Sequence, residues 1–310
     1  MVTGTANSTF PDSYRGRFAP SPTGPLHFGS LVAALGSYLD ARAHGGTWLV
    51  RIEDLDPPRE QPGAADDILR TLEALGLYWD EPVLYQHTRL DAYRTAIAKL
   101  LASGGAFPCA CTRSEIADSG LIGAEGAVYP GTCRNGLGGR PARAIRARVT
   151  SEPVEFVDSL QGVVRQNLEH EIGDFVIRRA DGYIAYQLAV VVDDAYQGIT
   201  HVVRGADLLI STPRQIQLQH LLELPTPIYM HLPVALNAAG EKLSKQTGAE
   251  PLALASPGLA LYRALLFLHQ APPAALRTAS PASILEWAVS HWQPHILSGI
   301  RSQKTELESI

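Results

Sequence analysis

The pattern of apolar and polar positions changes several times along the chain. Residues 47–52 (TWLVRI) form a short, nearly continuous apolar run of the kind that a buried strand shows. Residues 64–75 and 91–101 repeat apolar positions with the period of an amphipathic helix. Short β-like runs return at residues 174–178 and 198–203. Strands that alternate with helices predict an α/β fold with a doubly wound, Rossmann-type parallel sheet, where ligands bind at the carboxyl ends of the strands.

The same pattern divides the chain into regions. We expect the polar residues 1–14 to be a disordered extension, and residues 15–106 to form the first half of the Rossmann domain. Residues 107–140 are rich in Gly, Cys and Pro and lack periodicity, which indicates an insertion. Residues 141–236 are expected to supply the second half of the domain. Residues 237–310 are expected to hold a lysine-bearing loop and a small helical region.

Composition narrows the kinds of partner. The chain has 310 residues, 45% of them apolar, enough to bury a full core and a second small one. Its formal net charge of −5 excludes a surface coated in basic residues, so a nucleic acid would have to meet a local basic patch. One interval would be either such a patch or the solvated face of a strand or hairpin; it contains Arg134, Arg140, Arg143, Arg146 and Arg148.

The sequence also bears on the compartment. No apolar run is long enough to cross a bilayer, and residues 1–15 lack the basic start and apolar middle of a secretory signal. Three cysteines cannot all pair with one another, which argues against a disulfide scaffold and for a reducing environment. We therefore expect a cytoplasmic protein, and nothing in the sequence demands more than a monomer.

A turn motif lies near the amino terminus, at residues 17–30 (RFAPSPTGPLHFGS). Its Pro and Gly residues run into an apolar, Ala- and Leu-rich stretch, which predicts a strand, a tight loop and a helix that begins near Gly29. Such a loop presents free backbone N–H groups and a positive helix dipole end, where a polyphosphate can bind. His27 lies just before this helix and is expected to face the bound group.

A second motif, residues 242–245 (KLSK), places two lysines on a Gly-bounded loop. Together the two motifs resemble the signature pair of class I aminoacyl-tRNA synthetases, and the residues around them resemble the glutamate/glutamine branch. Two positions depart from the general family form. Ser30 replaces the final His of His-x-Gly-His, and Gln246 replaces the final Ser of Lys-Met-Ser-Lys-Ser.

The resemblance implies an ATP site. It assigns ATP binding to His27, Gly29, Ser30 and Lys245, and it makes His27, Lys242 and Lys245 the catalytic residues. By the same resemblance, Lys245 stabilises the pentacoordinate α-phosphate while glutamate is adenylated, and Mg²⁺ accompanies the ATP. Losing one such charge-stabilising donor typically costs roughly 10²–10³-fold in rate. Without the first motif, the two lysines would be read as a surface loop.

Amino-acid selection is expected to depend on charge. A γ-carboxylate in a dry pocket needs a bidentate partner, and the guanidinium fork of arginine fits it. Arg17 resembles the family arginine in this role, and Arg204 is a second candidate. Glu53 matches the acid that holds the α-ammonium group; for Glu53 and Arg204 the structural alternative is a strand-end salt bridge. The resemblance also places in the pocket Phe18, Ala19, Pro20, Ser21 and Tyr186, for the last of which core packing is the alternative.

All three cysteines of the chain lie in the predicted insertion. Cys109 and Cys111 are separated by one residue and Cys133 follows about twenty positions later, which suits a tetrahedral thiolate zinc site that closes a loop. No histidine lies between residues 109 and 133, so Tyr129 is the positionally natural fourth ligand, although a phenol is an unusual one. The Cys-x-Cys and Tyr-x-x-x-Cys pattern resembles the zinc insertion of glutamyl-queuosine tRNA(Asp) synthetases, which implies one structural Zn²⁺ per chain.

The resemblance extends from about Arg15 to the final helices. It implies that L-glutamate is activated by ATP without tRNA. The resemblance also implies that glutamate is then transferred to the cyclopentenediol of queuosine, at the wobble position of tRNA(Asp). The sixty-five residues after Lys245 are too few for an anticodon-binding domain of about a hundred residues or more, so we expect none. Charging of tRNA(Glu) through acceptor stem and anticodon together would then be out of reach.

Three alternatives stay open at this stage. The chain could be a truncated glutamyl-tRNA synthetase that charges a tRNA 3′ end. It could instead be an inactive synthetase-like protein that binds RNA or glutamate as a regulator, or a zinc-based nucleic-acid module with a passenger domain. The intact His27, Lys245, Arg17 and Glu53 argue against the regulator, and the small insertion argues against the zinc module.

Overall fold

The computed structural model describes residues 13–123, 125–243, 250–252 and 255–305. Its strands are β1 (Arg15–Phe18), β2 (Thr47–Ile52), β3 (Leu84–Tyr85), β4 (Ala106–Cys109), β5 (Ile122–Gly123), β6 (Gly126–Ala127), β7 (Ala144–Ala147), β8 (Val154–Asp158), β9 (Gly162–Gln166), β10 (Val176–Arg178), β11 (His201–Gly205), β12 (Ile228–Leu232), β13 (Val234–Leu236) and β14 (Ser302–Lys304). Its α-helices are α1 (Phe28–Ala43), α2 (Ala64–Ala74), α3 (Leu90–Ala102), α4 (Arg113–Ala117), α5 (Leu168–Glu171), α6 (Tyr186–Tyr196), α7 (Thr212–Leu222), α8 (Pro257–Phe267) and α9 (Pro281–Ser290). Short 3₁₀ helices are η1 (Pro57–Arg59), η2 (Gln86–Arg89), η3 (Ala206–Ser211), η5 (Ala274–Thr278) and η6 (Pro294–Leu297).

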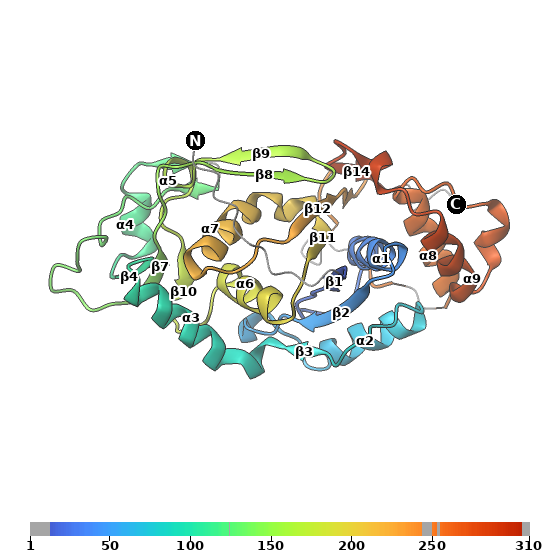
Figure 1. Ribbon diagram of the computed structural model, residues 1–310, viewed down its shortest axis with the longest axis horizontal. Coiled ribbons are helices and arrows are strands. Elements are labelled where there is room, and N and C mark those ends of the chain that lie inside the picture. Colours follow the sequence, from blue (N-terminus) through green and yellow to red (C-terminus); the bar gives the residue numbers. More distant parts are fainter. Residues whose placement is uncertain (1–12, 124, 244–249, 253–254, 306–310) are drawn as a thin grey trace.

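A parallel sheet forms the centre of the molecule (Figure 1). Strand β2 pairs in parallel with β1 and β3, and β12 pairs in parallel with β11 and β8. The two groups of strands meet where the Thr200 N–H donates to the Arg15 carbonyl at 3.0 Å, beside β1 and β11. Strand β9 adds an antiparallel edge to β8. The predicted α/β fold with a parallel sheet is therefore confirmed.

Helices cover both faces of this sheet, because its strands are apolar on both sides. On one face, α1 packs through the fully buried Leu31, Leu35 and Leu39, and α8 and α9 lie outside it. On the other face, α3, α6 and α7 pack around Leu188 and Leu218. These two layers place the carboxyl ends of β1 and β11 side by side, which is where the candidate site forms.

A second, antiparallel sheet corrects the predicted boundary of the insertion. Strand β7 pairs antiparallel with β4, with Cys109 opposite Ala144, and with β10, with Val176 opposite Arg146. Residues 141–178 therefore belong in part to this sheet rather than to the Rossmann domain, which the sequence predicted to resume at residue 141. Local pattern identifies a strand but does not identify its partner, so the pairing was beyond reach of the sequence.

The amino-terminal boundary is also corrected. Tyr14, predicted to lie in a disordered extension, is 8% exposed, and its hydroxyl donates to the Asp40 carboxylate at 2.5 Å. Its ring stacks on His201 with 3.9 Å between centroids. Residues 1–12 lie outside the described residues.

The carboxyl-terminal part packs beside α1. Helices α8 and α9 contact α1 and each other, and the Trp292 indole N–H donates to Asp40 at 2.9 Å. Strand β14 pairs in parallel with β13, which carries the chain towards the lysine motif. Among the helices of the described residues, none combines the length and the hydropathy that a membrane span requires.

Candidate active site and metal centre

A cleft of about 500 Å³ opens at the carboxyl ends of β1 and β11. It brings together residues that are more than two hundred positions apart in the sequence. The predicted site residues that line it are Arg17, Phe18, Ala19, Pro20, Ser21, His27, Gly29, Ser30, Glu53, Tyr186, Arg204 and Lys242. Lys245, the remaining predicted residue of the cleft, lies outside the described residues.

One end of the cleft is the amino terminus of α1. His27 is the N-cap residue, and its Nδ1 accepts a hydrogen bond from the Ser30 N–H at 3.4 Å. A Cβ atom at Gly29 would lie 3.2 Å from the His27 ring and 3.6 Å from the Leu243 carbonyl oxygen. The start of the lysine motif therefore lies against the helix end, at the place where the dipole favours an anion.

Lys242 is held at the cleft by an acid that the sequence did not indicate. Its Nζ lies 2.6 Å from the Asp207 carboxylate, and Asp207 also lines the cleft. The Leu243 N–H donates to the Ala235 carbonyl at 2.8 Å, which fixes the path of the chain into the motif. Because both partners of the Lys242–Asp207 pair are partly exposed, an arriving phosphate can compete with the carboxylate for the lysine.

Arg17 and Glu53 belong to one buried network of charges. Asp194 accepts from Arg17 Nε and Nη2, at 3.1 and 3.3 Å, and also pairs with Arg51 at 2.8 Å. Arg51 in turn lies 3.3 Å from Glu53. Burial alone would raise the pKa of Asp194, but Arg17 and Arg51 outweigh it and lower that pKa. The network fixes Arg17 with one edge of its guanidinium on Asp194.

The pKa of Glu53 shifts in the opposite direction from that of Asp194. Burial raises the pKa of Glu53, and Arg51 and Arg17 only partly oppose this effect. A buried carboxylate in that state gains from a further positive charge, such as an ammonium group in the cleft. The sequence motif indicates Glu53. It indicates no role for Arg51, which lies in the apolar run of β2, or for Asp194, which lies on the last turn of α6.

Arg204 is buried at 5% exposure, and its bonds go to neutral groups. Nη1 donates to the Tyr186 hydroxyl at 3.2 Å, and Nη2 donates to Thr212 and Gln215 at 2.9 and 2.8 Å. Within the described residues no carboxylate forms a direct ion pair with it. A buried guanidinium without a counter-charge is costly, so its position in the cleft favours an anionic ligand.

His231 supports Arg204 from behind. Arg204 Nε lies 3.1 Å from His231 Nε2, and His231 Nδ1 lies 2.5 Å from the Asp158 carboxylate. Both His231 and Asp158 side chains are fully buried. Burial, together with the positive charge of Arg204, lowers the pKa of His231 to about 4 against the opposing effect of Asp158. The imidazole is therefore neutral near pH 7, with its proton on Nδ1. No motif in the sequence indicates either His231 or Asp158.

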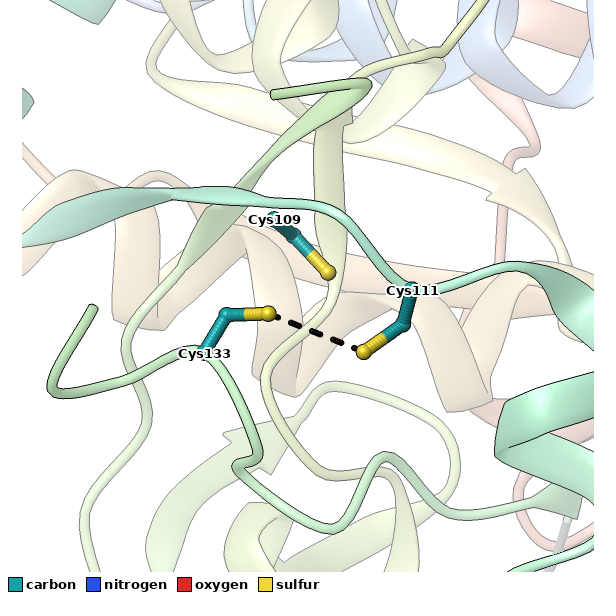
Figure 2. Close-up of side chains that lie close together, drawn as sticks. All are labelled: Cys109, Cys111 and Cys133. Carbon is teal, nitrogen blue, oxygen red and sulfur yellow. Dashed lines mark hydrogen bonds between the residues drawn. The ribbon is translucent and has the colours of Figure 1, made fainter. Parts of the chain in front are cut away.

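The three cysteines form a cluster beside the antiparallel sheet. Figure 2 shows their sulfur atoms pointing toward one another, and all three lie within 4.8 Å of each other. Cys111 and Cys133 are 3.6 Å apart, and the Tyr129 hydroxyl lies 3.5 Å from Cys109 and 4.0 Å from Cys111. The predicted ligands, remote in sequence, thus meet at one point.

These separations fit a tetrahedral zinc ion. Zinc–sulfur bonds of about 2.3 Å separate two sulfurs by about 3.8 Å, and a zinc–oxygen bond of about 2.0 Å separates oxygen from sulfur by about 3.5 Å. Arg146 Nε lies 3.3 Å from Cys109, and Arg140 Nη2 lies 3.5 Å from Cys111. Two guanidinium groups beside three thiolates would offset the negative charge of such a ligand set.

Comparison with known proteins agrees with this geometry. Residues 13–252 match the family model described as tRNA synthetases class I (E and Q), catalytic domain. The chain is 62% identical over 282 residues to the glutamyl-Q tRNA(Asp) synthetase of Dechloromonas aromatica, covering 90% of this chain and 94% of that protein. It is 60% identical over 280 residues to the protein of that name from Aromatoleum aromaticum, covering 90% and 89%.

Among solved structures, the fold matches glutamate-tRNA synthetase from Elizabethkingia anophelis. The TM-score is 0.77 at 24% sequence identity, and the match covers 93% of this chain and 67% of that one. At this identity the likeness shows a shared fold, while the sequence matches show the family. The chain therefore belongs to the class I tRNA synthetases of the glutamate and glutamine type, within the glutamyl-Q tRNA(Asp) synthetase family, and is an ATP-dependent ligase.

Proposed function

We propose that the cleft activates L-glutamate with ATP in the absence of tRNA. We further propose that the chain transfers the glutamate to the queuosine cyclopentenediol at the wobble position of tRNA(Asp). The observation that carries the first part is Arg204, a buried guanidinium without a carboxylate partner in the described residues, in the cleft where α1 presents its amino terminus. The names of the relatives support the second part.

The activation step needs little covalent chemistry from the protein. The α-carboxylate of glutamate attacks the α-phosphate of ATP, the bond to the β-phosphate breaks, and pyrophosphate leaves with the acyl-adenylate still bound. The amino terminus of α1, with His27, Gly29 and Ser30, would bind the phosphates, and Lys242 and Lys245 would stabilise the charge that develops. Mg²⁺ would arrive with ATP and neutralise part of its phosphate charge.

The other side of the cleft would select the amino acid. Arg204 and Arg17 would hold the γ-carboxylate, and Glu53 would hold the α-ammonium group. Glutamine would leave the guanidinium groups poorly paired, and such a loss can discriminate by about 10⁴–10⁵-fold. The walls of this pocket would be Phe18, Ala19, Pro20, Ser21 and Tyr186.

A structural Zn²⁺ would be held by Cys109, Cys111, Cys133 and Tyr129. The Cys111–Cys133 separation of 3.6 Å and the Tyr129–Cys109 separation of 3.5 Å support this ligand set. Structural zinc contributes roughly 10–16 kcal/mol of apparent binding free energy in small domains. The ion would hold the loop between β4 and β7 against the antiparallel sheet.

Two assays test the proposal. Glutamate-dependent exchange of pyrophosphate into ATP without tRNA tests activation, and no exchange would refute it. Labelled glutamate offered to tRNA(Asp) with and without queuosine tests transfer. Label should appear only on the queuosine-containing RNA and should protect the cyclopentenediol from periodate, which cleaves a free cis-diol. Label on the 3′ end of tRNA(Glu) would instead favour a glutamyl-tRNA synthetase activity.

A further inference from the structure

A second cavity, of about 500 Å³, lies beside the cysteine cluster, between α4, β7 and β10. Four arginines line it: Arg113, Arg143, Arg146 and Arg179. Among the described residues that line this cavity, Asp181 is the only carboxylate. We call it the arginine pocket. It is strongly positive in a chain whose formal net charge is −5.

The arginine pocket differs from the arginine-rich interval seen in the sequence. Arg134 and Arg140 form ion pairs with acids, and Arg146 and Arg148 donate to main-chain carbonyls. Arg143 is exposed, and its side chain has no hydrogen-bond or ion-pair partner in the described part of the chain. Most of the interval is therefore structural, and Arg143 is the member that is available to a ligand.

Arg113 completes the available pair. It is the first residue of α4, is exposed, and its side chain likewise lacks a partner among the residues that the structure describes. Arg143 comes from the segment that leads into β7, so two elements direct unpaired guanidinium groups to one concave site. Guanidinium groups bind phosphate oxygens in a fork, and a concave site can enclose a phosphate on more than one side.

A chain of ion pairs joins the arginine pocket to the cleft. Arg179, on the pocket wall, lies 3.3 Å from one oxygen of Asp56. The other oxygen of Asp56 lies 2.5 Å from Nε of Arg59, and Arg59 lines the cleft. The side chains of Arg59, Asp56 and Arg179 therefore form a continuous line of contacts from the cleft to the arginine pocket. A ligand too large for the cleft would reach the pocket along this line.

We propose that the arginine pocket binds a backbone phosphate of the RNA substrate, close to the nucleotide that receives glutamate. This inference rests on the proposed function, because it takes the acceptor in the cleft to be part of an RNA chain. The net negative charge of the protein repels RNA, so local arginines must supply the attraction. A phosphate bound there fixes the direction in which the RNA leaves the cleft.

The test uses the full chain with Arg113→Gln, Arg143→Gln and the double variant. Each should raise the KM for queuosine-containing tRNA(Asp) roughly fivefold or more, with the glutamate-dependent pyrophosphate exchange unchanged. In filter binding of the same RNA, the slope of log affinity against log salt should fall by about 0.7 for each arginine removed. Arg143→Lys should recover part of the affinity because it retains the charge.

Arg277→Gln is the matched control, since Arg277 is an exposed arginine on η5, in the carboxyl-terminal helical region. It should change neither KM nor the salt slope. An unchanged KM and salt slope in the double variant would overturn the proposal. So would an altered KM for ATP in the tRNA-free exchange, which would assign the pocket to a small anion. If the wild-type chain glutamylates no RNA, the proposed function fails, while filter binding still reports on the pocket.

Discussion

Arg204 Nε donates to His231 Nε2 across 3.1 Å, so the guanidinium that faces the cleft is oriented by an imidazole that must accept there. His231 can accept at Nε2 only while its proton is on Nδ1, where Asp158 receives it. A protonated imidazole would have no acceptor for Arg204 and would place two positive charges side by side. The orientation of Arg204 thus depends on the neutral state of His231.

The stability of the protein should fall on acidification because of His231. Its pKa is about 4 in the folded chain against 6.5 ordinarily, so between these values the unfolded chain binds the extra proton. Stability should therefore decrease as the pH falls from 6.5 to 4, by about 3 kcal/mol from this residue. His231→Gln, which keeps a donor and an acceptor, should show a smaller drop in the urea midpoint between pH 7 and pH 4.5. An equal drop in both proteins would contradict this assignment.

Removing the guanidinium of Arg204 should weaken recognition of the γ-carboxylate. Arg204→Gln should lower kcat/KM for glutamate in pyrophosphate exchange by about 10²-fold or more, because a buried carboxylate loses its charged partner. ATP binding should persist, since the helix end that would hold the phosphates is not altered. Arg165→Gln, an exposed arginine on β9, is the control and should leave exchange unchanged. A kcat/KM for glutamate in Arg204→Gln equal to that of the Arg165→Gln control would remove Arg204 from the pocket.

Asp194 should be indispensable to the folded cleft. It pairs with both Arg17 and Arg51, and its replacement in Asp194→Asn would leave two buried guanidinium groups without their shared carboxylate. We expect a loss of about 3–5 kcal/mol in the free energy of unfolding, measured with urea at pH 7. Asp91→Asn removes an acid from an exposed pair with Arg94 and should leave the urea midpoint unchanged. Equal midpoints for the two variants would show that the buried network is unimportant to stability.

The sequence predicted those parts of the fold that short-range signals specify. The sequence predicts a strand at residues 47–52, and β2 occupies Thr47–Ile52, because a run of apolar residues preceded by Gly suits a buried parallel strand. The helix expected near Gly29 begins at Phe28, where Pro and Gly fix the preceding turn. The residues of the cleft could be predicted as a group because two motifs, rather than one, carried the resemblance.

What escaped prediction depends on contacts between distant segments. Arg51 looked like an interruption of an apolar strand, and only the approach of α6 gives it Asp194 as a partner. The pair of His231 and Asp158 forms because β12 and β8 are neighbours in the sheet, which no local pattern records. The polar character of residues 1–14 places Tyr14 in a predicted extension, whereas its burial depends on Asp40, which lies 26 positions away in the sequence.

The fourth zinc ligand can be tested without any enzymatic assay. The chain purified without chelator should contain one zinc ion, measured by metal analysis. Cys133→Ser should lose it, because Cys133 is one of the three thiolates. Tyr129→Phe should bind zinc about tenfold or more weakly, since the phenol oxygen is removed while the ring remains. The affinity is measured as the equilibrium zinc occupancy against increasing concentrations of a competing chelator. Tyr78→Phe alters an exposed tyrosine and is the control. A zinc affinity in Tyr129→Phe equal to that of the control would show that the fourth ligand lies elsewhere.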